Sequence, residues 1–447
     1  MKPDEIQRYP FVRSSTGFVP AIARAEGCTL FTADGGRVLD AAGGAIVVNI
    51  GHGRGEVTEA YARGAREATY VVPPFATESR VRLTERLRER WLPEGITRSV
   101  FTSGGSESMD AAIRLARQHH VSAGRPERWK VIGRELSYHG TTLATLAIGG
   151  HTKRRGAFEP LLIESPKFPA HYCLRCPLGL RRPSCGIACA DALEETILRE
   201  GPESIAAVVA EPIVGSTAGA LVPPDDYWPK LERICREHGI LLILDEVMTG
   251  FGRTGKRFAI EHWPVTPDIL VGGKGLAGGY APMGAIFARD SVVEPIEAQG
   301  DDLMFYTFSA HPGACAAADK VLEILEREQL VERAARVGRR LRERLASLES
   351  HPHVAEIRGR GLLLAVELVK DKETLEPFPA DAGVGYKTVV AGLAEGVFFY
   401  PGGCDPARDV VCLGPPFIVD DSEIEQIGAA LSKAIDSAVA RALAKSG

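Results

Sequence analysis

The sequence predicts an α/β fold, in which helices cover both faces of a mostly parallel β-sheet. From about residue 71 to residue 325, strand-like segments alternate with helical ones, which is the pattern of a parallel sheet with crossover helices. The strand-like segments are also continuous apolar runs, as strands buried on both faces require. These runs lie at residues 131–132, 205–210, 241–244, 269–271 and 284–288.

The chain begins and ends with segments of different character. Short strand-like pieces at residues 29–31 and 37–40 surround turn signals at residues 34–36. We expect a long helix from about residue 316 to residue 348, then a strand at residues 362–366. An apolar stripe from Ile424 to Leu443, with Asp421 and Ser422 as cap candidates, predicts a final helix that packs on a domain face.

The bulk composition is that of an ordinary globular enzyme. The 447 residues are 45% hydrophobic and 25% charged, which leaves room for two or three domains. The formal net charge of -5 gives no electrostatic reason to expect nucleic acid or an anionic membrane as a partner. The N-terminus lacks the apolar stretch of a signal peptide, and no run has the length of a membrane span. We therefore expect a cytoplasmic protein.

Two chemically active side chains follow neighbouring strand-like runs. Lys274 lies in a glycine loop after the run at residues 269–271, and Asp245 ends the run at residues 241–244. In open α/β sheets, ligands bind at this edge. An amine that can form a Schiff base, with a carboxylate that can hold a protonated ring nitrogen, is the protein half of pyridoxal phosphate chemistry. A lone loop lysine is more often solvated, so the prediction depends on both residues.

The segment Thr-Ser-Gly-Gly-Ser-Glu-Ser at residues 102–108 predicts a phosphate site. It follows a short strand at residues 99–101 and opens a helix, so free backbone N–H groups would face an anion. A simple helix cap is the alternative. No Walker lysine follows, which argues against a nucleotide loop.

Nine cysteines in a chain without a signal segment indicate reduced thiols. Four of them cluster, at Cys173, Cys176, Cys185 and Cys189. Two close pairs resemble a structural zinc site. The segment between the pairs is short, however, and the second pair starts a helix, so free packing thiols are the favoured reading and no metal is expected. In either case the cluster is structural.

With these pieces in place, the sequence resembles the class III aminotransferases. The most specific match is LDEVMTGFGRTG at residues 244–255, with residues 267–269 and 273–275, and residues 137–142 and 307–312 match two further motifs. The resemblance implies a fold type I pyridoxal phosphate enzyme with a seven-stranded sheet. Residues 71–325 would form the large domain, and residues 1–70 and 326–447 a smaller α+β domain. It also implies a homodimer, or a dimer of dimers, with shared active sites.

The family implies a role for each matching residue. Lys274 would hold the cofactor and move a proton, and Asp245 would pair with the ring nitrogen. Glu211 matches an acidic position near the ring, with an ordinary loop charge as the alternative. His139 and His311 are expected to be structural. Further cofactor contacts would be Tyr138 and Val247 on the two ring faces, Gly104, Gly105 and Ser106 at the phosphate, and Thr307 at the phosphate from the neighbouring subunit.

Departures from the family bear on the substrate. Thr141 occupies the position where the ornithine branch has an arginine, which makes a donor of the ornithine type less expected. Arg408 lies where amine transaminases carry a mobile arginine that clamps a carboxylate, the alternative being a solvated arginine. Ile46, Val47 and Phe75 match positions that line an apolar substrate pocket.

The predicted activity is a ping-pong transamination. An amine or omega-amino acid would donate the amino group, and a 2-oxo acid such as pyruvate or 2-oxoglutarate would accept it. A racemase or epimerase, an aminomutase and a decarboxylating transaminase could use the same lysine and aspartate. They remain the alternatives.

Overall fold

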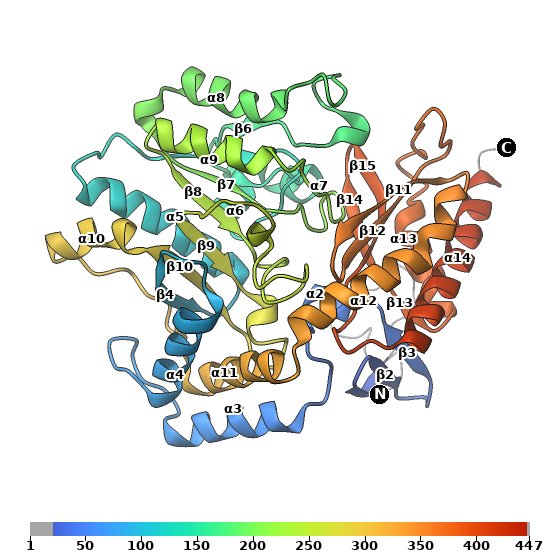
Figure 1. Ribbon diagram of the computed structural model, residues 1–447, viewed down its shortest axis with the longest axis horizontal. Coiled ribbons are helices and arrows are strands. Elements are labelled where there is room, and N and C mark those ends of the chain that lie inside the picture. The colour runs from blue at the N-terminus through green and yellow to red at the C-terminus, as the bar shows by residue number, and fades with distance from the viewer. Residues whose placement is uncertain (1–20, 445–447) are drawn as a thin grey trace.

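The computed structural model describes residues 21–444, and its largest element is a seven-stranded sheet covered by helices (Figure 1). The predicted α/β fold and the seven strands are thereby confirmed. The strand order is β4 (Ile96–Thr102), β10 (Gly284–Arg289), β9 (Ile269–Gly272), β8 (Leu241–Asp245), β7 (Ile205–Ala210), β5 (Lys130–Arg134) and β6 (Lys167–Phe168).

The sheet is parallel except at one strand. Strands β9, β8, β7, β5 and β6 pair in parallel, whereas β10 runs antiparallel to both β4 and β9. The register pairs Ala210 with Leu244 and Asp245 with Val271. The carboxyl ends of β7, β8 and β9 therefore lie at one edge of the sheet.

Both faces of the sheet are buried, which explains the continuous apolar runs. Ile243 and Ile269 belong to the core on one face, where α5 (Gly105–Ser122) and α10 (Asp290–Gln299) pack. Leu242 and Leu244 belong to the second core, which includes residues of α9 (Tyr227–Glu237) and α8 (Ala188–Glu200). Alternate residues of one strand thus point to opposite faces.

Segments from the two ends of the chain share one small sheet. Strand β13 (Val397–Phe398) pairs in parallel with β3 (Arg37–Asp40), which continues to β2 (Thr29–Thr32) and β1 (Ile22–Glu26). This pairing supports our proposal that residues 1–70 and 326–447 form one small domain beside a large domain of residues 71–325. Residues 1–20 and 445–447 of these ranges, and the segment expected to lack a signal peptide, lie outside the described residues.

A second small sheet has the order β11 (Val354–Arg360), β12 (Leu363–Leu368), β15 (Ala407–Leu413) and β14 (Tyr400–Cys404). It lies beside the helices at the C-terminal end of the chain (Figure 1). The remaining α-helices are α2 (Gly43–Ile46), α3 (Gly55–Glu67), α4 (Glu78–Arg86), α6 (Leu143–Ile148), α7 (Thr152–Arg155), α11 (Pro312–Arg327), α12 (Leu330–Leu345), α13 (Val384–Ala394) and α14 (Asp421–Leu443). Within residues 21–444, no helix is both long enough and apolar enough to span a membrane.

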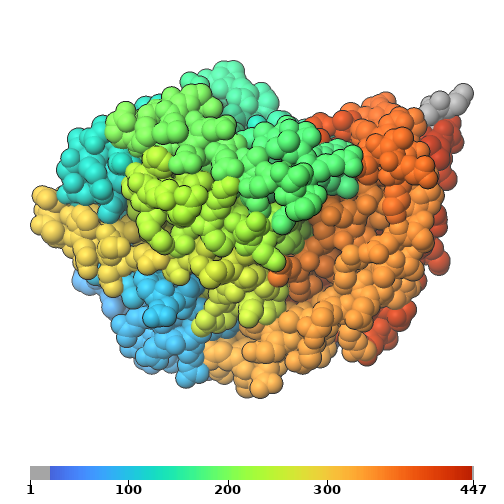
Figure 2. Space-filling view, turned by 45° about the horizontal axis from the view of Figure 1, so that its top comes forward, coloured from blue at the N-terminus to red at the C-terminus, as the bar shows by residue number. Residues whose placement is uncertain are grey.

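Buried polar contacts join the C-terminal segment of the proposed small domain to the large sheet region. Figure 2 shows the segments around residue 200 directly against those beyond residue 330. The Nε of Arg358 donates to the carbonyl of Gly219 at 2.7 Å, and its Nη1 lies 2.7 Å from Oε2 of Glu367. Because these groups are buried, the contact fixes how the two regions meet.

Two expectations about individual elements were wrong. The single helix expected at residues 316–348 is two helices, α11 and α12, because Gln329 adopts a left-handed conformation with φ 50°. The cap of α14 is Asp420 rather than Asp421 or Ser422, since its side chain accepts a hydrogen bond from the Glu423 backbone.

Candidate active site

Three ionisable side chains from three neighbouring strands meet in one cavity of about 200 Å³. Glu211 directly follows β7, Asp245 ends β8, and Lys274 comes two residues after β9. The cavity is lined by Gly105, Ser106, Tyr138, His139, Gly140, Glu211, Ile213, Gly215, Ser216, Asp245, Val247, Met248, Thr249 and Lys274.

The amine of Lys274 is buried among charged groups of both signs. Its pKa is lowered from 10.5 to about 8, chiefly by burial. The Arg253 and Arg154 charges act in the same direction, and Asp245 and Glu211 oppose them. Near neutral pH, a larger share of this amine is uncharged than in an ordinary lysine. An uncharged amine is the form that attacks a carbonyl carbon. The backbone φ of 38° at Lys274 is unusual for a residue with a side chain and is typical of strained functional positions.

The carboxylate of Asp245 is fixed through both of its oxygens. Its Oδ1 accepts a hydrogen bond from the Val247 backbone N–H at 3.0 Å, and its Oδ2 lies 2.8 Å from Nδ1 of His139. Both Asp245 and His139 are buried. The carboxylate therefore faces the cavity in one orientation, as a partner for a cationic ring nitrogen must.

Glu211 is a buried acid with one oxygen left over. Its Oε1 accepts a hydrogen bond from the Gly215 N–H at 3.2 Å, while its Oε2 has no hydrogen-bond partner among the described residues. Burial raises the pKa of Glu211 to about 7, Asp245 adds to this effect, and the nearby His139 and Arg134 oppose it. A polar group of a bound molecule could satisfy the free oxygen, because such an atom is costly to leave unpaired.

The N-terminus of α5 forms one end of the cavity. The helix begins at Gly105, where an added Cβ would lie 2.9 Å from Cγ1 of Val247. Only glycine therefore fits there without moving Val247. The Ser106 hydroxyl accepts a hydrogen bond from the Thr141 N–H at 3.1 Å. The free N–H groups of an 18-residue helix with a serine beside them are suited to a phosphate.

The aromatic and aliphatic side chains predicted to cover a ring also line the cavity. Tyr138 and Val247 are both among its lining residues. The guanidinium carbon of Arg154 lies 4.2 Å from the centre of the Tyr138 ring. The cavity thus combines a buried amine, a fixed carboxylate, an aromatic and an aliphatic side chain, and the N-terminus of a helix.

The Aminotransferase class-III family model matches residues 11–435 of the chain. The chain belongs to the class III aminotransferase family. It is 36% identical to the putrescine–pyruvate aminotransferase of Pseudomonas aeruginosa, over 95% of this chain and 92% of that enzyme. It is also 36% identical to the taurine–pyruvate aminotransferase of Rhodobacter capsulatus, over 93% of this chain and 90% of that enzyme.

The fold of this class III aminotransferase also matches that of a solved transaminase structure. The (S)-enantioselective omega-transaminase from Thermomicrobium roseum matches with a TM-score of 0.91 and 36% identity, covering 97% of both chains. The chain is therefore a pyridoxal phosphate-dependent transferase of fold type I. The residues present fit that cofactor, because an amine of lowered pKa, a Glu211 oxygen that accepts no hydrogen bond from the described residues and lies 3.7 Å from Nη2 of Arg134, and the glycine loop face one cavity.

Several predicted site residues of the aminotransferase do not line this cavity. Thr307 and Phe75 are exposed, and Phe75 is 66% accessible. Arg408 pairs with Asp405 at 2.8 Å. Ile46 is buried and Val47 is half-buried, and neither lines the cavity. Gly104 does not line it either, although it directly precedes the lining residue Gly105. Their assigned roles stay predictions.

Other lining residues were not predicted. Gly215 and Ser216 follow Glu211 after β7, and Met248 and Thr249 follow Asp245 after β8. The same strand-end rule that identified Asp245 extends a few residues beyond each strand, so it could have found them. His139 was expected to be structural, yet it lines the cavity and contacts Asp245 directly.

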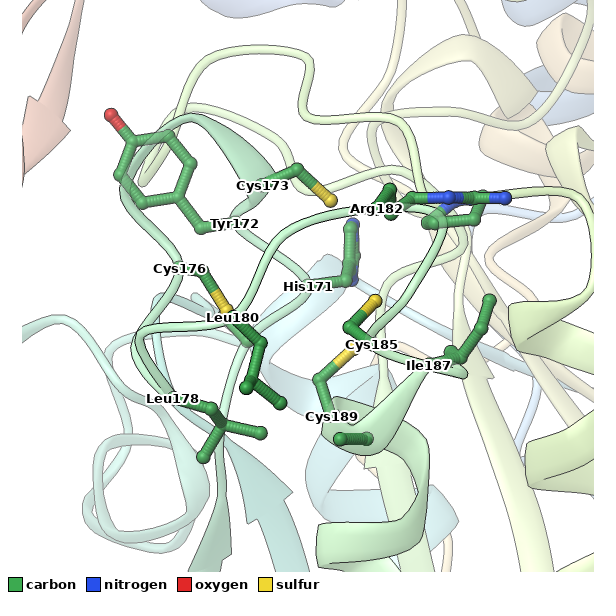
Figure 3. A pocket seen from close by; sticks show the side chains of 13 residues that line it. His171, Tyr172, Cys173, Cys176, Leu178, Leu180, Arg182, Cys185, Ile187 and Cys189 are labelled. Carbon is green, nitrogen blue, oxygen red and sulfur yellow. The ribbon is translucent and has the colours of Figure 1, made fainter.

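The four clustered cysteines line a separate small pocket, which Figure 3 shows at close range. Cys189 lies in the first turn of α8, as predicted, and all four thiols are free. Burial raises the pKa of Cys189 to about 11, and the other three thiols add to this effect. Over residues 21–444, no group of three or more His, Cys, Asp or Glu side chains is placed to hold a metal ion. The zinc alternative gains no support from this arrangement.

Proposed function

We propose that this class III aminotransferase moves an amino group from an amine or omega-amino acid to a 2-oxo acid such as pyruvate. One observation carries the proposal: the Lys274 amine and the fixed Asp245 carboxylate line the same cavity as the N-terminus of α5. The relatives named for putrescine and for taurine both use pyruvate as the acceptor, which supports this donor and acceptor class.

Lys274 and Asp245 would carry the chemistry. Pyridoxal phosphate, when bound, supplies an electron sink for the pair of electrons left at the substrate carbon. Lys274 would hold the cofactor and, once released by the incoming amine, would take a proton at Nζ from the substrate carbon and return it elsewhere. Asp245 would keep the ring nitrogen protonated, because an anion beside it favours the charged form. The lowered pKa of Lys274 suits a base that works near neutral pH.

The remaining cavity residues would bind and orient. Gly104, Gly105 and Ser106 would hold the phosphate at the N-terminus of α5. Tyr138 and Val247 would cover the two ring faces, which fixes the bond that is broken. Glu211 would place its free oxygen near the ring.

We also propose a homodimer, or a dimer of dimers, in which Thr307 reaches the phosphate of the neighbouring subunit. Thr307 is exposed and lies beside Met304 and Phe308, which are 74% and 63% accessible. The rings of Phe308 and Tyr70 meet edge to face, with their centroids 6.5 Å apart. Large exposed apolar side chains in one area are typical of a protein–protein interface, which supports the proposal that a second subunit buries them.

The proposed partners are otherwise small molecules, an amine donor and a 2-oxo acid, without nucleic acid or membrane. All nine cysteines are free thiols, which supports a reducing compartment and a cytoplasmic location. Arg408 would have to leave Asp405 before it could bind a substrate carboxylate.

The test is an absorption experiment on the purified holoenzyme. Amines and omega-amino acids are added without an acceptor, and the band of the lysine-bound cofactor is followed. The proposal expects the band to disappear with the true donor and to return when pyruvate or 2-oxoglutarate is added. A band that never converts would favour a racemase or mutase. The variant Lys274→Ala should lack the band altogether.

A further inference from the structure

An arginine outside the cavity lining lies against one of the cavity's aromatic residues. Arg154 belongs to α7, and its guanidinium carbon lies 4.2 Å from the centre of the Tyr138 ring. Thr152, on the same short helix, interacts with Cys404 of β14, and the two elements lie side by side in Figure 1. Arg154 is therefore held between the active cavity and the C-terminal part of the chain.

Within residues 21–444, no side chain neutralises the charge of Arg154. No carboxylate in the described part of the chain forms an ion pair with it, and no acceptor there holds its N–H groups. The neighbouring Arg155 is the opposite case. Its Nη1 donates to the carbonyls of Ala147 and Gly149 at 2.7 and 2.8 Å, and its Nε lies 3.0 Å from Oε1 of Glu159. Arg155 thus fixes α7, while Arg154 keeps its donors free.

The field of Arg154 reaches the active cavity. After burial and Arg253, it is one of the cations that lower the pKa of Lys274. It also adds to the burial that lowers the pKa of His151 to about 4, so that His151 is neutral at physiological pH. Lys153, the residue before it, is exposed, so water screens its charge. Arg154 therefore makes the region beside Tyr138 positive, close enough to the reacting amine to lower its pKa.

The chemistry of a guanidinium suits this position. It remains charged at any physiological pH, and its N–H groups can bind both oxygens of a carboxylate at once. Contact with an aromatic ring uses the face of the group, which leaves the in-plane donors available. The other candidates are less suited, because Arg408 is already paired with Asp405 and the residue at position 141 is a threonine.

We propose that Arg154 binds the carboxylate of the substrate beside Tyr138, at the edge of the active cavity. The inference rests on the proposed transaminase function and assigns its specificity to substrates that carry a carboxylate, the 2-oxo acid acceptor above all. Arg154 is then the residue that distinguishes a 2-oxo acid from an uncharged aldehyde of the same size.

The test compares two three-carbon acceptors in the holoenzyme, pyruvate and propanal, of which only pyruvate carries a carboxylate. For Arg154→Gln we expect the KM for pyruvate to rise by about 10- to 100-fold, the range of a lost charge-assisted hydrogen bond, with kcat little changed. The KM for propanal should stay within about twofold. Arg154→Lys should recover part of the pyruvate affinity. The matched control is Lys153→Gln, which removes the same charge from the exposed neighbour and should leave the KM for pyruvate within about twofold.

A binding measurement tests the same contact without turnover. Propionate, which has the carboxylate but no reactive carbonyl, should compete with pyruvate, and its Kd should rise in Arg154→Gln by a factor similar to that of the pyruvate KM. Equal losses with pyruvate and propanal would overturn the inference and leave Arg154 as packing for Tyr138. A pyruvate effect in Arg408→Gln but not in Arg154→Gln would also overturn it. If wild-type enzyme transfers no amino group to any 2-oxo acid, the proposed function has failed, and the propionate affinity still decides the role of Arg154.

Discussion

Nδ1 of His139 lies 2.8 Å from Oδ2 of Asp245, and both side chains are buried. The two residues come from distant parts of the chain, the loop after β5 and the end of β8. The second oxygen of Asp245 already accepts the Val247 N–H. His139 therefore sets the rotation of the carboxylate that the cofactor ring would meet, and it acts as a positioning residue.

The first prediction concerns this pair. His139→Ala should lower kcat by at least about 10-fold, because the buried Asp245 oxygen loses a hydrogen bond worth about 1.5 to 3 kcal/mol. In His139→Asn, the side-chain amide can take the place of Nδ1, so most of the activity should return. Steady-state kinetics at saturating substrate provide the measurement. Equal activity in the alanine and asparagine variants would show that the hydrogen bond is irrelevant.

The glycine pair at the start of α5 gives a matched test of the proposed phosphate site. An added Cβ at Gly105 would meet Val247 at 2.9 Å, whereas at Gly104 it would meet nothing within 4 Å. Gly105→Ala should therefore weaken pyridoxal phosphate binding by about 10-fold or more, since shifting a packed side chain costs about 1 to 3 kcal/mol. Gly104→Ala should bind nearly normally. Reconstitution of the cofactor-free enzyme, followed by absorbance, gives both values, and a larger loss at Gly104 would contradict the geometry.

The lowered pKa of Lys274 predicts how the free energy of unfolding of the cofactor-free enzyme depends on pH. The folded-state pKa of about 8 is below the ordinary value of 10.5. Between these values the unfolded chain binds more protons than the folded one, so the free energy of unfolding should rise with pH. Relative to Lys274→Met, the wild-type protein should gain about 3 kcal/mol across this window and should show no difference in slope below it. Denaturant unfolding at pH 7.5, 9 and 10.5 measures the effect. Parallel curves for the two proteins would refute it.

The buried contacts of Arg253 predict an effect on stability. This buried guanidinium donates to the carbonyls of Val48, Leu362 and Pro415 at 3.1, 3.2 and 2.6 Å. Arg253→Met would leave these acceptors unpaired and should lower the free energy of unfolding by about 3 kcal/mol or more. The exposed Arg233, which pairs with Glu237, is the control, and Arg233→Gln should cost less than about 0.5 kcal/mol. A similar loss in both variants would contradict the role given to burial.

The sequence was sufficient to predict which residues follow the strand ends. It was insufficient to predict features that depend on contacts with the rest of the molecule. Asp245 and Lys274 follow apolar runs, and parallel strands place such residues at one edge, so their meeting could be predicted. The antiparallel direction of β10 could not, because an apolar run has no direction. The break at Gln329 depends on a backbone conformation that glutamine rarely adopts.

The residues that bind the substrate were harder still to predict from the sequence. Phe75 and Thr307 are exposed in one chain, so any role they have depends on a surface that a single sequence does not describe. Arg154 carries no motif, and its position follows only from the packing of α7 on Tyr138. Local patterns therefore predicted that Asp245 and Lys274 meet in one cavity, whereas the surroundings of Arg154 follow only from tertiary contacts.

The pairing of β3 with β13 also constrains the order in which the protein folds. During synthesis, β3 emerges early, yet the strand that completes its edge is made only when the ribosome reaches Val397. Until then, the N-terminal hairpin presents an unpaired edge to other nascent chains. Contacts between such distant residues form slowly because the intervening loop must close first. We therefore expect the seven-stranded sheet to fold while translation continues. The sheet of β1, β2, β3 and β13 should form only when translation is nearly complete.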